Sequence, residues 1–207
     1  MQVQERALAP WEVHLTLADL LGAVSSDAPS ERQRAELEAA ARAAPDEPLP
    51  QVLLADLETD PDRRLARAEA LRKAYPRSLD AAVFLARVLR DDGGPVEGRR
   101  EAMLDAVVLA PDDVDALTAH ALEEARVGEL TRAFQSLRRA EALAPWNPGV
   151  FVTRAAVLAR LGDCQEAVDA VQRAMDVLPD EAPATALTPL VKERARIQGT
   201  CRPAHGP

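Results

Sequence analysis

The sequence predicts an all-α protein made of helical hairpins that repeat along the chain. Three prolines, Pro111, Pro145 and Pro179, lie 34 residues apart, and an apolar segment precedes each of them. A fixed period of this length is typical of stacked hairpins, because a single hairpin cannot bury its apolar face without neighbours. Apolar residues form 47% of the chain but aromatic residues only 3%, so Ala, Leu and Val must build the core. Ala and Leu favour helix, and no segment alternates as a strand would.

Counting back from the prolines divides residues 80–181 into three units, which are 80–113, 114–147 and 148–181. A glycine turn separates two helical stretches in each unit, at Gly93-Gly94, Gly128 and Gly162. Glycine is expected at such a place because it ends one helix and starts the next turn without steric cost. Small and apolar residues recur on the second helix of every unit. They are Met103 and Ala106 in the first unit, Ala133, Leu137 and Ala140 in the second, and Ala167, Val171 and Ala174 in the third.

These units resemble the tetratricopeptide repeat (TPR) family. The unit that begins at Pro148 carries large, small and proline residues at the family's signature positions, namely Phe151, Ala155, Ala167, Val171, Ala174 and Pro179. In unit 80–113, Arg87 and Arg99 stand where the family has small residues, so a wider or shifted hairpin is expected there. The resemblance implies a right-handed superhelix of about five antiparallel hairpins, a TPR-like solenoid closed by a C-terminal capping helix.

The period weakens toward the N-terminus. After a leader at 1–10, residues 11–79 are expected to form two degenerate hairpins, which are common where a solenoid must be capped. Two helix starts stand out in this part of the chain. Ser30 is followed three residues later by Gln33, and Asp60 comes directly before Pro61. Both patterns predict a helix N-cap.

Two cysteines are expected to meet near the other end of the chain. A single helix over 182–199 should close the last hairpin, followed by a disordered tail at 200–207. Cys164 starts the second helix of the last unit, and Cys201 follows the closing helix. Since consecutive helices of a solenoid are antiparallel, the two sulfurs would be neighbours. They would form a disulfide in an oxidising compartment, or remain two ordinary thiols in a cytosolic chain.

The charge of the chain argues against several kinds of partner. The formal net charge is −9, and no basic stripe with interleaved aromatic residues occurs, so no nucleic-acid binding is expected. No stretch approaches the roughly 18 apolar residues that direct membrane insertion needs. The segment Met1 to Arg6 lacks the pattern of a signal peptide. Localisation stays open: cytoplasmic from the missing signal peptide, or periplasmic or otherwise extracytoplasmic if the disulfide forms.

No catalytic or metal-binding pattern is found. The motifs G-x-S-x-G and H-E-x-x-H and a phosphate-binding glycine loop do not occur. Glu123-Glu124 is interpreted as part of a solvated helix face, and Asp113 as a helix cap. His120 and Glu124 have the spacing of two metal ligands, but a third ligand is missing. We therefore expect no enzyme activity, no cofactor and no metal.

The resemblance also implies a peptide-binding groove on the concave surface, lined by the first helix of each unit. The matching positions are Phe84 and Val88 in the first unit, Thr118, Leu122 and Arg126 in the second, and Val152, Ala156 and Arg160 in the third. An apolar trough edged by guanidinium groups suits an extended or helical peptide with acidic character. The alternative is that these residues pack against neighbouring helices while the arginines reach to solvent. The chain has a single asparagine, Asn147, and no lysine in the groove, so the family's carboxylate clamp for chaperones is not expected.

The function predicted from these features is that of a non-enzymatic scaffold, which binds an unidentified protein or peptide in the concave groove. An alternative stays open beside it. The repeats, with one cysteine in the last hairpin and another after the cap, also resemble the extracytoplasmic tails of some bacterial membrane glycosyltransferases and peptidases. In that case the chain would be a soluble domain of a larger envelope enzyme and would serve docking or assembly.

Overall fold

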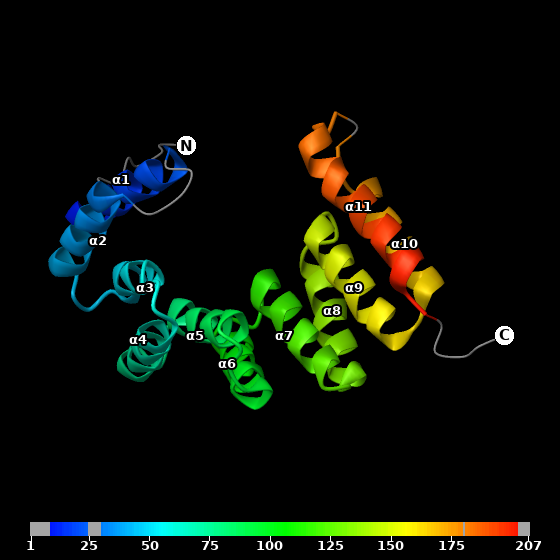
Figure 1. Ribbon diagram of the computed structural model, residues 1–207, viewed down its shortest axis with the longest axis horizontal. Helices are drawn as coiled ribbons and strands as arrows, with labels where there is room; N and C mark the ends of the chain where they lie inside the picture. The colour runs from blue at the N-terminus through cyan, green and yellow to red at the C-terminus, as the bar shows by residue number, and fades with distance from the viewer. Residues whose placement is uncertain (1–8, 25–29, 180, 203–207) are drawn as a thin grey trace, which may run out of the picture. The chain divides into compact units, whose positions relative to one another are not determined.

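The computed structural model describes residues 9–24, 30–179 and 181–202, and within these ranges the chain is entirely helical (Figure 1). The all-α prediction is confirmed, and the described residues form eleven helices, the number expected for five hairpins and a closing helix. The helices are α1 (Pro10–Val24), α2 (Glu31–Ala43), α3 (Pro48–Asp56), α4 (Pro61–Ala74), α5 (Leu79–Asp91), α6 (Val96–Leu109), α7 (Val114–Arg126), α8 (Leu130–Leu143), α9 (Pro148–Leu161), α10 (Cys164–Asp176) and α11 (Ala184–Thr200). Most of the predicted leader and most of the predicted tail lie outside the described residues.

The chain divides into two compact units, and each is described by itself. Unit 1 covers Met1–Pro95 and contains α1 to α5, and unit 2 covers Val96–Pro207 and contains α6 to α11. The boundary between them lies inside the repeat predicted over 80–113. The two helices of that predicted repeat, α5 and α6, therefore belong to different units.

Unit 1 is built from helices whose starts the sequence marks clearly. Ser30 and Asp60 are N-caps, as predicted, and each side chain accepts a hydrogen bond from the backbone N–H three residues later, at 3.1 and 2.9 Å. Such a cap satisfies one of the N–H groups that a helix start leaves without a partner. The core of α3, α4 and α5 is formed by Val52, Ala55, Ala68, Ala81, Phe84 and Val88.

Unit 2 contains the hairpins α7–α8 and α9–α10, and small residues let their helices approach closely. Gly128 and Gly162 lie in the two turns with φ of 83° and 86°, values that a residue with a side chain rarely adopts. The signature residues predicted for these hairpins form its core and are fully buried, among them Ala121, Ala133, Leu137, Ala140, Ala155, Ala167, Val171 and Ala174.

Helix α11 closes this unit. Leu190 and Ile197 pack into the same cluster as Phe151 and Ala155 of α9 and the buried face of α10. Pro189 lies inside α11, so it does not mark the start of the helix. The helix continues to Thr200, one residue into the predicted tail. No helix in the described ranges is long and apolar enough to cross a bilayer.

A buried ion network surrounds one of the two arginines that replace small residues of the repeat pattern. Arg99 of α6 donates to Glu123 of α7 across 3.1 Å, and the Arg100 side chain donates twice to Glu124 across 3.1 and 3.2 Å. The interpretation of Glu123-Glu124 as a solvated face is therefore wrong: the two residues are 5% and 3% exposed. Their charges are tolerated because each carboxylate has at least one guanidinium partner.

The other arginine at a small position, Arg87, lies in unit 1. Its guanidinium is 2.8 Å from the Asp56 carboxylate and lies over the Phe84 ring, 5.5 Å from its centroid. Arg87 and Arg99 thus stand where the family has small residues because each has a carboxylate within reach on a neighbouring helix.

Candidate functional site

The two groove residues predicted in unit 1 are part of its core. Phe84 is 1% exposed and Val88 is 0% exposed, and both pack with Val52, Ala55 and Ala68. A side chain buried in this way presents no surface to a ligand. In addition, these two residues belong to a different unit from the other six.

In unit 2, three of the predicted groove residues serve the helices themselves. Leu122 packs against the core cluster of α7 and α8, and Val152 against the cluster closed by α11. The Thr118 hydroxyl donates to the carbonyl oxygens of Val114 and Asp115, both at 3.0 Å. For these residues the structure favours the packing alternative, although all three are half-buried and keep some surface.

The arginines predicted at the groove edge are exposed, and they differ in their partners. The Arg126 guanidinium lies 3.3 Å from the Glu123 carboxylate, one turn earlier on α7. Arg160, one repeat further on, lines an open pocket together with Ala156. Two of the eight predicted groove residues, Ala156 and Arg160, are thus brought together at this pocket.

We call this pocket the arginine pocket. It has a volume of about 330 Å³ and is lined by Ala156, Ala159, Arg160, Arg196, Thr200, Cys201 and Arg202. Its walls are the C-terminal ends of α9 and α11, which run in the same direction because each is antiparallel to α10. The sequence prediction missed Arg196, Thr200 and Arg202. The signal that could have found them is their position beside Cys201, which the sequence already placed near the last hairpin.

A disulfide bond holds the end of α11 against the last hairpin. The structure joins Cys164, at the start of α10, to Cys201, directly after α11. The Cys201 sulfur also lies 3.7 Å from the Ala159 carbonyl oxygen of α9, and Cys201 packs against the cluster that contains Phe151 and Ala155. The end of α11 is thereby fixed against both helices of the last hairpin.

The electrostatics of the arginine pocket are positive. The Arg196 guanidinium donates twice to the Glu193 carboxylate, at 2.7 and 2.6 Å, and these bonds hold the pKa of Glu193 below its usual value. The same pair raises the pKa of Arg196. No ion pair involves Arg160 or Arg202 among the described residues. Two of the three guanidinium groups thus carry charges that no described carboxylate neutralises.

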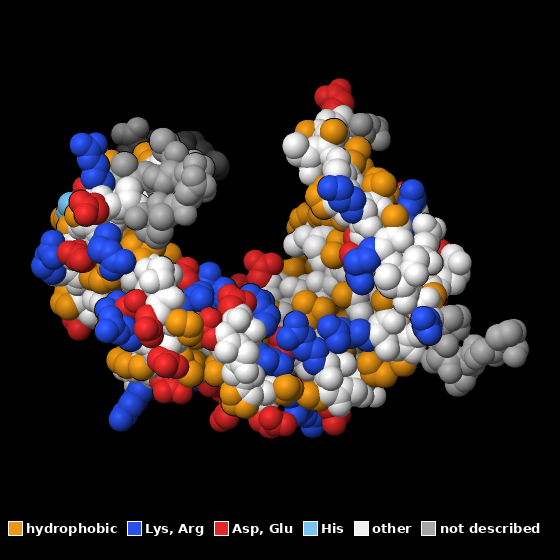
Figure 2. Space-filling view, in the orientation of Figure 1, with side chains coloured by type: hydrophobic (Ala, Val, Ile, Leu, Met, Phe, Trp, Pro, Cys, Tyr) orange, Lys and Arg blue, Asp and Glu red, His pale blue; other side chains and the backbone are white. Residues whose placement is uncertain are grey.

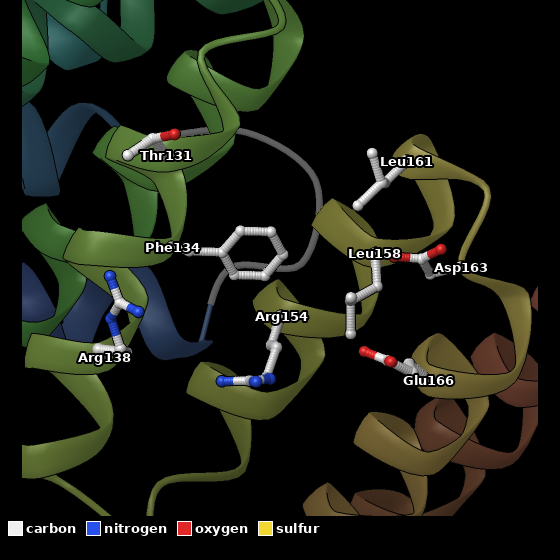
Figure 3. A pocket seen from close by; sticks show the side chains of 8 residues that line it. All are labelled: Thr131, Phe134, Arg138, Arg154, Leu158, Leu161, Asp163 and Glu166. Carbon is white, nitrogen blue, oxygen red and sulfur yellow. The ribbon is translucent and has the colours of Figure 1, made fainter. Parts of the chain in front are cut away.

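A second pocket lies between α8, α9 and α10, and the sequence prediction missed it as well. It has a volume of about 410 Å³ and is lined by Thr131, Phe134, Arg138, Arg154, Leu158, Leu161, Asp163 and Glu166. Figure 3 shows Phe134 pointing from α8 toward α9, with Arg138 on one side and Glu166 and Asp163 on the other. An adjoining pocket of about 310 Å³ shares Arg154, Leu158 and Glu166 with it. Prediction from the first helix of each unit could not find this pocket, because the second helices supply much of its walls.

The charges of this second pocket are mixed and partly paired. The Arg154 guanidinium is 3.2 Å from the Glu141 carboxylate and lies over the Phe134 ring, 5.9 Å from its centroid. Acidic side chains line both of the adjoining pockets, with Asp163 and Glu166 in one and Glu166 and Asp169 in the other. This face of unit 2 therefore lacks the uniform charge of the arginine pocket.

His120, considered above as a metal ligand, is part of the buried ion network. Its Nδ1 atom is 2.9 Å from the Ser136 hydroxyl, and its Nε2 atom is 3.4 Å from the Glu124 carboxylate. Burial lowers the pKa of His120, with a smaller contribution from Arg100 and Arg132, while Glu124 opposes the shift. In the part of the chain that the structure describes, no group of three or more His, Cys, Asp or Glu side chains is placed to hold a metal ion.

Comparison with known proteins shows what this fold resembles. No protein-family model and no curated protein matches the sequence. Among solved structures, the thermophilic TPR protein TTC0263 of Thermus thermophilus is 20% identical with a TM-score of 0.69, over 91% of this chain and 98% of that one. MamA of Desulfovibrio magneticus RS-1, from residue 41 to its end, is 16% identical with a TM-score of 0.60, over 83% and 97% of the two chains.

A third solved structure is YrrB, a TPR protein described as having an unusual peptide-binding site. It is 18% identical with a TM-score of 0.57, over 85% of this chain and 89% of that one. Identities of this size concern the fold. The chain has a TPR-like helical solenoid fold, and the resemblance seen in the sequence is confirmed at that level.

Proposed function

We propose that this TPR-like solenoid is a non-enzymatic scaffold for protein–protein interaction, and that unit 2 binds a segment of a partner protein along α7, α9 and α11. We call these three helices the binding row. Solenoids commonly bind partners on the surface that successive repeats form together. TPR proteins among the structural neighbours include one described as having a peptide-binding site, which supports the same class of function here.

The observation that carries the proposal is the arginine pocket at the end of the binding row. Along the row, Leu122, Val152 and Ala156 are half-buried and offer apolar contact, and Arg126 and Arg160 are exposed one repeat apart. An extended or helical segment can use such a surface, with apolar contacts for affinity and charged groups for orientation.

The test is a site-specific photocrosslink in cells that produce the protein. A benzoylphenylalanine replaces Arg126 on the binding row, and in a matched control it replaces Arg139 on α8. Both arginines are exposed, and each pairs with one carboxylate, that of Glu123 for Arg126 and that of Asp112 for Arg139. We expect one defined protein to crosslink to position 126 and not to position 139. Equal crosslinking at the two positions, or none at 126, would contradict the proposal.

A further inference from the structure

We infer that the arginine pocket binds carboxylate side chains, so that the segment recognised by unit 2 is acidic. The inference rests on the proposed function, because it names the chemistry of the segment that would lie on the binding row. It also concerns a site that the sequence did not predict, since two of its three arginines come from the end of α11 and the residues after it.

The arginine pocket has a positive charge. None of the described residues that line the pocket is acidic, whereas the two adjoining pockets between α8, α9 and α10 described above carry carboxylates. The chain as a whole has a formal net charge of −9, so three arginines gathered at one place run against its average. On the face seen in Figure 2, separate basic side chains and little acidic surface lie over α9 to α11.

The arginines of the pocket lie at the C-terminal ends of two helices, where they could serve the helices themselves. Helix C-termini carry partial negative charge, and arginines there often stabilise the last carbonyl groups. In this protein backbone N–H groups already bind some of these carbonyl oxygens. Gly162 and Asp163 donate to the carbonyl oxygens of Ala159 and Leu158 at 3.3 and 3.0 Å, and Cys201 donates to that of Ile197 at 2.9 Å. In addition, neither Arg160 nor Arg202 donates to a carbonyl oxygen among the described residues, so these two guanidinium groups remain available to a ligand.

The geometry of the pocket suits a carboxylate. A guanidinium presents paired N–H groups that match the two oxygens of a carboxylate, as Arg196 already does with Glu193. That pair holds Arg196 in place and leaves Arg160 and Arg202 for a ligand. The small side chains of Ala156 and Ala159 keep the floor of the pocket open. The disulfide fixes Cys201 to the start of α10, and the Cys201 sulfur lies 3.7 Å from the Ala159 carbonyl oxygen, so the backbone that leads to Arg202 is held beside the end of α9.

The experiment measures binding of the full chain to two probe peptides by fluorescence anisotropy. One is a short peptide of alternating Glu and Ala, amidated at its C-terminus and labelled with fluorescein at its N-terminus, so that the peptide's own carboxylates are all on side chains and the carboxylate of the dye is common to both probes. The other has Gln in place of each Glu. We expect the Glu peptide to bind about tenfold more tightly than the Gln peptide, as hydrogen bonds to charged groups imply. This preference should weaken as salt is raised.

Three double variants show which arginines cause the preference for the Glu peptide. R160A/R202A should bind the two peptides equally, and R160K/R202K, which keeps the charge but loses the paired N–H groups, should keep a reduced preference. The matched control R138A/R173A removes two exposed arginines from α8 and α10 and should behave as the unchanged protein. Circular dichroism checks that each variant is folded.

The inference is overturned if the unchanged protein binds both peptides equally. It is also overturned if R160A/R202A keeps the full preference or if the control loses it. The photocrosslink at position 126 separates the two proposals. If that crosslink forms but the preference for the Glu peptide is absent, the proposal of an acidic ligand is wrong, and the proposal of a protein-binding scaffold is kept.

Discussion

Cys164 and Cys201, which are 37 residues apart in the sequence, are bonded to each other and tie the end of α11 to the start of α10. These are the only two cysteines of the chain, so reduction acts at this bond alone. The bond restricts the unfolded chain, because it closes a loop of that length whether or not the protein is folded. By the loop-entropy relation this is worth about 3–4 kcal/mol of stability.

We therefore expect reduction, or the change C164S/C201S, to lower the free energy of unfolding of unit 2 by about 3–4 kcal/mol. Urea denaturation followed by circular dichroism, with and without reducing agent, measures the loss. The double variant serves as the control, because reducing agent should not change its denaturation curve. Rapid alkylation of the non-reduced protein by iodoacetamide, followed by mass spectrometry, should find no free thiol. Two alkylated cysteines would contradict the bond.

Substitution of Phe84 shows whether its ring serves folding or binding. Since its ring is 1% exposed within the core of unit 1, F84A should lower the free energy of unfolding by about 3–5 kcal/mol. The control is W146A, because Trp146 is 70% exposed and its removal should change stability by less than about 0.5 kcal/mol. Thermal denaturation compares the two. If F84A left the free energy of unfolding unchanged, the ring would not be in the core, and Phe84 would again be a candidate groove residue.

Removal of a single charge from the buried ion network should lower the stability of the protein strongly. E123Q removes one negative charge and keeps the shape of the side chain, so Arg99 no longer faces this carboxylate. The site is buried, because the Arg99 side chain is 11% exposed and that of Glu123 is 6% exposed. We expect a loss of about 3 kcal/mol, because a buried charge that loses its partner keeps its desolvation cost. In the control E141Q, the pair with Arg154 is 30% and 29% exposed and should cost less than about 1 kcal/mol. Equal losses in the two variants would show that burial of the pair is not decisive.

The stability of the protein should depend on pH through His120. Burial lowers its pKa in the folded protein below the ordinary 6.5, so near and below that pH the unfolded chain binds more protons than the folded one. Stability from this group is therefore full above about pH 6.5 and falls as the pH drops toward the lowered folded pKa. Urea midpoints at about pH 8 and about pH 5.5 should differ more for the unchanged protein than for H120Q. If H120Q lost more stability than the unchanged protein between these two pH values, His120 would not be the source of the pH dependence.

Much of the fold could be predicted from the sequence, because the deciding interactions are local. The turn glycines Gly128 and Gly162 and the caps Ser30, Asp60 and Asp113 act within a few residues of themselves. A helix start or a hairpin turn needs no information from the rest of the chain. The 34-residue period likewise follows from one hairpin packing on the next.

The site was less predictable, and particular residues show why. Phe84 matches a groove position of the repeat family, yet in this chain it faces the core of unit 1. Glu123 and Glu124 have the sequence appearance of a solvated face, but Arg99 and Arg100, 24 residues earlier, make their burial tolerable. No pattern within one helix records the approach of a partner from another helix.

By itself, the sequence determined the helical class, the hairpin period, the turn and cap residues, and the nearness of the two cysteines. All of these depend on backbone conformation and on contacts between adjacent repeats. The tertiary structure alone decided which side chains are buried and which charges are paired. It also decided that Arg160, Arg196 and Arg202 meet at one pocket. That meeting requires α11 to fold back along α10, where the disulfide joins Cys201 to Cys164 and the Cys201 sulfur lies 3.7 Å from the Ala159 carbonyl oxygen of α9.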